Sequence, residues 1–289
     1  NLFAGSLGGI VFLSTNNGTS WKATSAGLTH TEVRALAVIG TNLFAGTVGG
    51  GVCLSTINGT SWTTVNSGLT NTNVRALAVI GTNLFAGTYG GGVFLSTNNG
   101  TSWTTVNSGL TNKDIQALGV MGTNLFAGTK NGFFLSTNSG TSWMSINDGL
   151  TNTNVRAFAI DGSTLYAGTW GGGVFFIKEN TSNWTAVSNG LTYSYIQALA
   201  FCGTNLYAGT GGGVFLSTNN GNNWTVLNTG LSYTYVQALA AIGTNLFAGI
   251  GGGGVCLLTN NSTNWISVNN GLSYSTDVYA LANIGTNLF

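Results

Sequence analysis

The sequence predicts an all-β protein, a seven-bladed β-propeller in which four-stranded antiparallel blades stand around a common axis. Three observations predict it: a phrase ending in Trp recurs seven times, four short apolar runs separated by Gly and Asn fill each interval of about 40 residues, and no helical periodicity occurs. Intervals of this kind are typical of propeller blades. We expect a single domain over residues 1–289, made of seven repeats of about 41 residues.

The recurring phrase is represented by Ser96-Thr97-Asn98-Asn99-Gly100-Thr101-Ser102-Trp103. Its closing Trp falls at Trp21, Trp62, Trp103, Trp143, Trp184, Trp224 and Trp265, with spacings of 41, 41, 40, 41, 40 and 41 residues. A period this regular is the signature of a repeat architecture.

One repeat illustrates the strands that we expect. They cover 74–80, 84–88, 92–96 and 102–106, with turns at 81–83, 89–91 and 98–100 and a loop to the next repeat at 107–112. Asn and Gly suit these turns because they tolerate positive φ. Small residues such as Ala76 and Ala78 fit the innermost strand, where blades converge, and Phe85, Phe94 and Trp103 fit the wider outer strands. The continuous apolar runs predict inner strands that are covered on both faces.

The two ends of the chain predict how the ring closes. The chain opens on a second strand, residues 1–5, and reaches a first strand near its end, residues 277–282. We expect this late strand to supply the innermost position of the blade that residues 1–25 begin, which removes free sheet edges. Asn287-Leu288-Phe289 duplicates Asn1-Leu2-Phe3, and only one copy can fill the shared position. Because Asn1 follows neither Met nor a signal peptide, we expect a piece of a longer chain.

Composition excludes several classes of protein. Charged residues are 4% of the chain and the net charge is +1, so no basic stripe is available for nucleic acid. The apolar runs are far shorter than the ~20 residues of a membrane helix, so no membrane insertion is expected. Cys53 and Cys256 replace Phe in sister repeats, so we expect buried core thiols and no disulfide framework. No ligand cluster for a metal and no cofactor-binding motif is found, and none is expected.

The phrase from Ser14 to Trp21 resembles the Asp-box, or bacterial neuraminidase repeat, Ser-x-Asp-x-Gly-x-x-Trp, over all seven repeats. This chain departs from it at the Asp position, which holds Asn16, Ile57, Asn98, Asn138, Glu179, Asn219 and Asn260. Asn can still bond its own backbone in a turn, so the hairpin should survive. The resemblance implies a propeller of the sialidase-like or secreted bacterial kind, with the box on the face opposite the binding site. It leaves the function open.

The sequence does not predict an enzyme. The resemblance to sialidases would call for three arginines and a catalytic carboxylate, but Arg34, Arg75 and Arg156 share one position of the repeat, at the start of the first strand. We expect this column to bond loop carbonyls near the channel mouth. A glycosidase also needs two carboxylates at a fixed separation, and no pair of the six acids is convincing. His30 is the single histidine, so no Ser-His-Asp or Cys-His set exists.

Departures from the repeat indicate where a ligand could bind. They concentrate in the turn after the second strand and in the loop between blades, both on the face opposite the box hairpins. The aromatic residues at these positions are Tyr89, Trp170, Tyr193, Tyr195, Tyr233, Tyr235 and Tyr274. Exposed aromatic side chains on a rigid scaffold suit a sugar or a protein hot spot. The alternative is that each Tyr only covers a neighbouring Gly-rich turn.

These observations favour a non-catalytic extracellular binding module of bacterial origin, with a carbohydrate or protein ligand on the face opposite the box. The alternative is a structural spacer or assembly unit of a larger surface protein or fibre, since a neutral surface rich in Ser, Thr and Asn suits such a role. A sialidase-like glycosidase is the third hypothesis.

Overall fold

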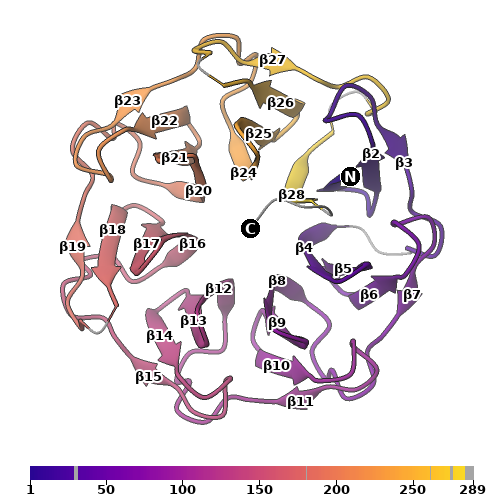
Figure 1. Ribbon diagram of the computed structural model, residues 1–289. Coiled ribbons are helices and arrows are strands. Elements are labelled where there is room, and N and C mark those ends of the chain that lie inside the picture. The colour runs from indigo at the N-terminus through magenta and orange to yellow at the C-terminus, as the bar shows by residue number, and fades with distance from the viewer. Residues whose placement is uncertain (29–31, 180, 261, 274–275, 284–289) are drawn as a thin grey trace.

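The computed structural model of the chain is a closed ring of seven four-stranded antiparallel sheets, which confirms the predicted seven-bladed β-propeller (Figure 1). The structure describes residues 1–28, 32–179, 181–260, 262–273 and 276–283, and no helix occurs in these ranges. In six blades the strands pair in chain order, and in the seventh β28 precedes β1; in each, the first strand lies at the axis and the fourth at the circumference (Figure 1).

The strand bounds repeat from blade to blade. The first strands are β4 (Val33–Ile39), β8 (Val74–Ile80), β12 (Ile115–Met121), β16 (Val155–Asp161), β20 (Ile196–Cys202), β24 (Val236–Ile242) and β28 (Val278–Asn283). The second strands are β1 (Leu2–Ser6), β5 (Asn42–Thr47), β9 (Asn83–Thr88), β13 (Asn124–Thr129), β17 (Thr164–Thr169), β21 (Asn205–Thr210) and β25 (Asn245–Ile250). The third strands are β2 (Val11–Ser14), β6 (Gly51–Ser55), β10 (Gly92–Ser96), β14 (Gly132–Ser136), β18 (Gly173–Lys178), β22 (Gly213–Ser217) and β26 (Gly254–Leu258). The fourth strands are β3 (Lys22–Ala23), β7 (Thr63–Thr64), β11 (Thr104–Thr105), β15 (Met144–Ser145), β19 (Thr185–Ala186), β23 (Thr225–Val226) and β27 (Ile266–Ser267).

Ring closure follows the prediction. β28 pairs with β1, with Phe3 opposite Ala282, so the late strand completes the blade that the first residues begin. Leu2 and Phe3 occupy the second strand and are buried. The duplicate copy at 287–289 lies outside the described residues. Without β28, the inner edge of β1 would have no partner strand.

The repeated Trp locks adjacent blades together. The indole Nε1 of Trp103 donates to the carbonyl of Val65 in the preceding blade at 2.7 Å, and its backbone N–H donates to the carbonyl of Ser67 at 2.8 Å. The same pair of bonds recurs around the ring, and Trp21 closes it by donating to Val268 at 2.7 Å. This use of Trp103 explains why the fourth strand is shorter than the predicted 102–106: its start is committed to the neighbouring blade.

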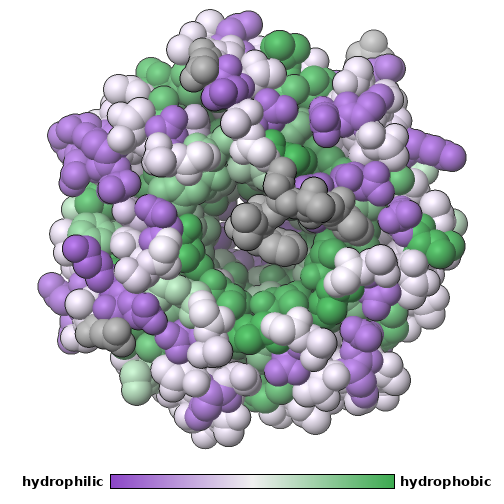
Figure 2. Space-filling view, in the orientation of Figure 1, coloured by the Kyte–Doolittle hydropathy of each residue, from purple (hydrophilic) through white to green (hydrophobic). Residues whose placement is uncertain are grey.

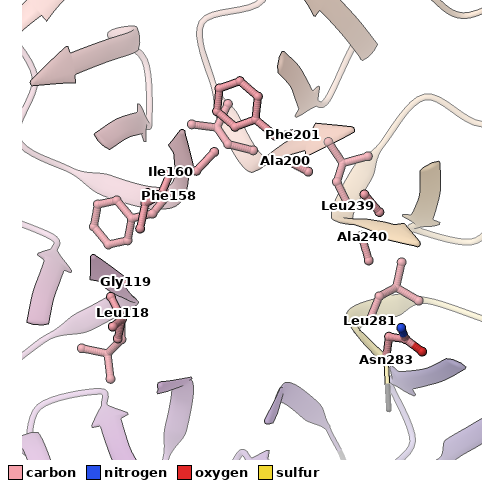
Figure 3. Close-up of a pocket in the computed structure, with 14 residues that line it drawn as sticks. Leu118, Gly119, Phe158, Ile160, Ala200, Phe201, Leu239, Ala240, Leu281 and Asn283 are labelled. Carbon is pink, nitrogen blue, oxygen red and sulfur yellow. The ribbon is translucent and has the colours of Figure 1, made fainter. Parts of the chain in front are cut away.

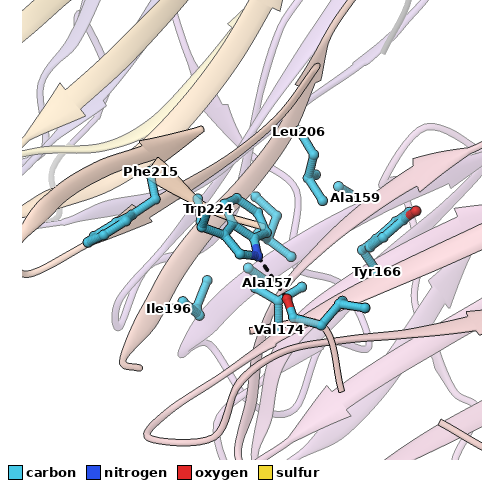
Figure 4. Packing of buried hydrophobic residues seen from close by; sticks show 11 residues of the cluster. Ala157, Ala159, Tyr166, Val174, Ile196, Leu206, Phe215 and Trp224 are labelled. Atoms are coloured by element: carbon cyan, nitrogen blue, oxygen red, sulfur yellow. Dashed lines mark hydrogen bonds between the residues drawn. The ribbon is translucent and has the colours of Figure 1, made fainter. Parts of the chain in front are cut away.

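The core is divided into wedges between neighbouring blades. In one of them Trp224 and Phe215 pack against Val174 and Tyr166 of the preceding blade, and Trp224 donates to the Val187 carbonyl at 2.8 Å (Figure 4). Each second strand contributes a glycine at the point where it comes closest to the first strand of the next blade. A Cβ on Gly87, for example, would collide with the side chain of Ile115 in the next blade. The wedge therefore depends on complementary shape across each pair of blades.

The innermost strands differ from the prediction that both of their faces are covered. In β8, Val74, Ala76 and Ala78 are buried, whereas the residues between them are only half-buried. The half-buried residues of the first strands line a central channel (Figure 2). The second strands are the ones covered on both faces, because neighbouring blades leave no channel there.

Candidate functional site: the channel mouth and its rim

The loops predicted to carry a ligand lie together on one face, which we call the rim face. It comprises the turns between second and third strands and the loops that lead into the next first strand. Single β-bridges join these two loops across neighbouring blades, pairing Leu7 with Glu32, Tyr89 with Asp114, and Trp170 with Tyr195. The variable positions of the repeat are therefore spatial neighbours.

Trp170 and Tyr195, both on the face predicted to bind a ligand, form an aromatic pair. Their ring centroids lie 5.1 Å apart with planes at 73°, an edge-to-face arrangement. The guanidinium of Arg156 lies 4.7 Å from the Trp170 ring centroid, and its Nε donates to Asn154 Oδ1 at 3.1 Å. Tyr195 remains 49% exposed, so one aromatic partner is accessible while the other is held by a cation.

Tyr235 lies on the same face, in the loop that leads into β24, two blades after the blade of Trp170. Its hydroxyl accepts a hydrogen bond from Gln197 Nε2 at 3.1 Å, and its ring lies against the turn glycines Gly211 and Gly251. The ring is 45% exposed. Tyr89, two blades from Trp170 along the ring, lies under the guanidinium of Arg75 at 4.3 Å from the ring centroid.

The remaining predicted tyrosines belong to a different layer. Tyr193 and Tyr233 take the outer position of the loop, where their rings cover Gly212 and Gly253. This is the packing role that was kept as the alternative for all the tyrosines, and Tyr235 shares it over Gly211 and Gly251. Both rings are also exposed. Tyr274 lies outside the described residues, so the predicted set divides into an inner group around Trp170, Tyr195 and Tyr235 and an outer pair.

The arginine column forms the mouth of the channel. In every blade the ladder between first and second strands skips one residue, which makes that residue a β-bulge. The seven bulged residues are Arg34, Arg75, Gln116, Arg156, Gln197, Gln237 and Tyr279, and all of them line a cavity of about 270 Å³. The column is recognisable in the sequence, where it was not predicted to take part in binding.

The bonds of the arginines differ from the expected ones. Arg34 forms an ion pair with Glu32 at 2.6 Å and lies 3.9 Å from the Tyr279 ring centroid. Arg75 donates to Gln116 Oε1 at 2.9 Å. The partners found are side-chain oxygens and aromatic rings, so the prediction of loop carbonyls was wrong.

The mouth concentrates positive charge. Burial lowers the pKa of Arg75, and repulsion from Arg34 lowers it further. Burial also lowers the pKa of Arg156, with repulsion from Arg75 as the next cause. Repulsion from Arg34 thus acts on both Arg75 and Arg156, while the carboxylates of Asp114 and Glu32 act on the pKa of Arg75 in the opposite direction. Within the described residues, Arg34 and Glu32 form the one ion pair.

The other end of the channel is apolar. Leu118, Phe158, Phe201, Leu239 and Leu281 line a cavity of about 480 Å³ there (Figure 3). Phe158 leans over Gly119, which has no side chain to exclude it. The channel thus passes from a polar, cationic mouth to a hydrocarbon-lined end.

In the part of the chain that the structure describes, no three His, Cys, Asp or Glu side chains gather as metal ligands would. The same residues include no helix of the length and hydropathy needed to cross a bilayer. Cys53 and Cys256 are buried free thiols, as expected, and burial raises the pKa of each to about 11. Such thiols are poor nucleophiles.

Comparison with known proteins finds likeness in structure alone. No protein-family model and no curated protein matches the sequence. The extracellular domain of a protein described as a one-component system of B. thetaiotaomicron is similar, with a TM-score of 0.71 and 20% identity over 91% of this chain and 39% of that one. A GH74 xyloglucanase from Xanthomonas campestris has a TM-score of 0.73 and 16% identity over 93% of this chain and 52% of that one. YCF48 bound to D1 peptide has a TM-score of 0.63 and 15% identity over 81% of both chains. At these identities the likeness shows the propeller fold, which sensor domains and enzymes share.

Proposed function

We propose that this chain is a non-catalytic extracellular binding module that holds a glycan or a protein on the rim face. The observation that carries the proposal is the inner group of aromatic residues, in which Tyr195 and Tyr235 are about half exposed beside Trp170 and Arg156. Tyr, Trp and Arg are the residue types that dominate binding hot spots. They stand on loops fixed by a rigid ring, so little conformational entropy is lost on binding.

The comparisons support the location and leave the ligand open. One similar structure is the extracellular domain of a bacterial protein, and another is a xyloglucanase. A third was solved with a peptide. Propellers of this shape are therefore compatible with either a saccharide or a peptide ligand.

A glycan array followed by titration of the strongest hit tests the proposal. Tyr195→Ala/Tyr235→Ala should lose at least tenfold in affinity, because both rings of the inner group would be removed. Tyr193→Ala/Tyr233→Ala is the matched control, with the same substitutions in the outer layer of the same loops, and should change affinity less than threefold. An array without hits, repeated with a peptide library and again without hits, would count against the proposal, as would unchanged binding by the inner variant.

The second candidate function is a structural spacer, favoured by the 4% content of charged residues and the net charge of +1. Neutral surfaces of this kind repel one another weakly. The parent gene discriminates the two: further propeller repeats beside a cell-wall sorting domain favour the spacer. A screen with fluorogenic sialosides and common glycosides tests the third hypothesis, a glycosidase, for which we expect no turnover.

A further inference from the structure

The cationic mouth carries an inference that rests on the proposed function and names the class of its ligand. The rim face holds five of the seven cationic side chains and four of the six carboxylates. The cations are Arg34, Arg75, Lys113, Lys130 and Arg156, and the carboxylates are Glu32, Asp114, Asp148 and Asp277. The cavity at the mouth is lined by the three arginines and, among the described residues, by no carboxylate. The field at the mouth is therefore positive and would draw anions toward it.

Two of the three guanidinium groups at the mouth are not neutralised by an ion pair. Glu32 pairs with Arg34, and Asp277 Oδ1 accepts from the backbone N–H of Gly252. Among the described residues, Arg75 and Arg156 make no ion pair with any carboxylate, and their bonds go to the neutral oxygens of Gln116 and Asn154. Half-buried cations that repel one another destabilise the empty mouth, and an anion placed between them would relieve this cost.

The surroundings of the two arginines identify the kind of anion. Gln116 lies between them around the opening, and Gln197 and Gln237 follow Arg156. Each amide offers one acceptor and two donors, a combination that suits hydroxyl groups better than it suits a carboxylate alone. The exposed rings of Tyr195 and Tyr235 suit the apolar face of a sugar, and the Tyr235 hydroxyl is bonded to the Gln197 amide. Guanidinium, amide and aromatic groups together match a sugar that carries a carboxylate.

The size of the cavity limits what enters. Its volume is about 270 Å³, slightly below the range of ~300–1,000 Å³ that small-ligand pockets usually have. One residue of a saccharide fits such a space, and the rest of the chain would extend over the aromatic rim. We infer that the channel mouth binds a hexuronate residue of an acidic glycan, with its carboxylate between Arg75 and Arg156 and its hydroxyls on the glutamine amides.

Titration calorimetry with tetragalacturonate tests this inference, with the fully methyl-esterified tetrasaccharide as the neutral probe. We expect the acid to bind at least tenfold more tightly than the ester, and Arg75→Gln and Arg156→Gln each to weaken the acid by at least tenfold. Lys130→Gln is the matched control: it removes the same charge from an exposed position of the rim face and should change affinity less than threefold. Glu32→Gln should strengthen binding severalfold, because it releases Arg34 to the ligand.

The outcomes separate the inference from the proposed function. Equal binding of acid and ester, lost in Tyr195→Ala/Tyr235→Ala but kept in the arginine variants, would overturn the hexuronate assignment and leave the binding module intact. Binding of a tetraglutamate peptide in preference to both saccharides would replace the ligand class. If neither saccharide nor the peptide binds, both the hexuronate assignment and the proposed binding module are contradicted. If the arginine variants do not fold, the wild-type affinity for the acid must still fall with added NaCl while that for the ester stays constant.

Discussion

The two faces of the ring are built by different rules. On the face of the box hairpins, four turns use one set of bonds: the Asn Oδ1 of each accepts the backbone N–H four residues on at 2.9 Å, and the preceding Ser Oγ donates to it. On the rim face, equivalent turns carry Leu7, Val48, Tyr89, Lys130 and Trp170. The repeated contacts serve stability, and the variable ones are free to serve recognition. Substitutions should therefore separate cleanly into two groups.

The largest effect is expected at the Trp lock. Trp224→Ala should lower the free energy of unfolding by about 3–5 kcal/mol, because it opens a cavity in the wedge between two blades. Trp224→Phe retains an aromatic ring but leaves the Val187 carbonyl without its donor, which costs about 1–3 kcal/mol. Denaturant titration measures both. A smaller loss for Ala than for Phe would contradict the role assigned to packing.

The buried thiols predict a loss of stability at alkaline pH. Burial raises the pKa of Cys53 and Cys256 from 9.0 to about 11 in the folded chain. Between these values the unfolded chain releases the proton and the folded one keeps it, so stability present below pH 9 is lost as pH rises toward 11. The loss amounts to roughly 2–3 kcal/mol per thiol.

The double variant Cys53→Ala/Cys256→Ala checks this prediction. Its free energy of unfolding, measured as a function of pH, should fall less steeply between pH 9 and 10 than that of the wild type. Burial also raises the pKa of Tyr166 and Tyr207 above 10.0, so a residual slope at higher pH is expected in the variant. An unchanged slope between pH 9 and 10 would show that the thiols are not buried as described.

The glycine of the second strand should be intolerant of any side chain. Gly87→Ala places a Cβ against Ile115 and should cost about 1–3 kcal/mol through overpacking. Gly87→Ala/Ile115→Ala removes the Cγ2 methyl that the new Cβ would meet, so its loss should be smaller than the sum of the two single losses. Thermal unfolding of the four proteins in this cycle measures the coupling; strict additivity would argue against the contact.

A smaller effect is expected at the hairpin. Asn98→Ala removes the acceptor of the Ser102 N–H and the Ser96 hydroxyl and should cost about 0.5–1.5 kcal/mol. Because Ile57 already occupies this position in another blade, the fold itself should survive. Differential scanning calorimetry of Asn98→Ala against Thr104→Ala, an exposed strand position nearby, provides the comparison.

The smallest effect on stability should come from the rim. Tyr195→Ala/Tyr235→Ala should change the free energy of unfolding by less than about 1 kcal/mol, since both rings are exposed. Its effect on ligand affinity should be the largest of the set. A loss of stability comparable to that of Trp224→Ala would show that these rings stabilise the fold. The two faces would then not differ in the way described.

The fold could be predicted because the repeat displays it seven times. Trp21 to Trp265 fix the number of blades, the apolar runs fix the strands, and the positions of Leu2-Phe3 and Val278 in the repeat fix the closure. The aromatic pair of Trp170 and Tyr195 also follows from the sequence, because consecutive blades must be neighbours. These are consequences of local pattern and period, which a linear sequence records directly.

Other features depend on how the blades meet. The bulge that turns Arg75 to the channel mouth is a property of the pairing register between β8 and β9. No residue type in β8 predicts it. Likewise, the separation of Tyr195 from Tyr193 into inner and outer layers depends on which glycines lie beneath each ring. Bond partners of the arginines were mispredicted because they come from side chains of adjacent positions and blades.

By itself, the sequence determined the number of blades, the order of their strands, the closure of the ring and the face on which variation gathers, since each of these is written in spacing and composition. The sequence also placed the arginine column near the channel mouth. Only the tertiary structure decided that a bulge turns each of these residues into one opening and that Arg75 and Arg156 line it without carboxylate partners. The physical reason is that charge density depends on distance across the axis, and residues 81 positions apart become neighbours only when the ring has closed.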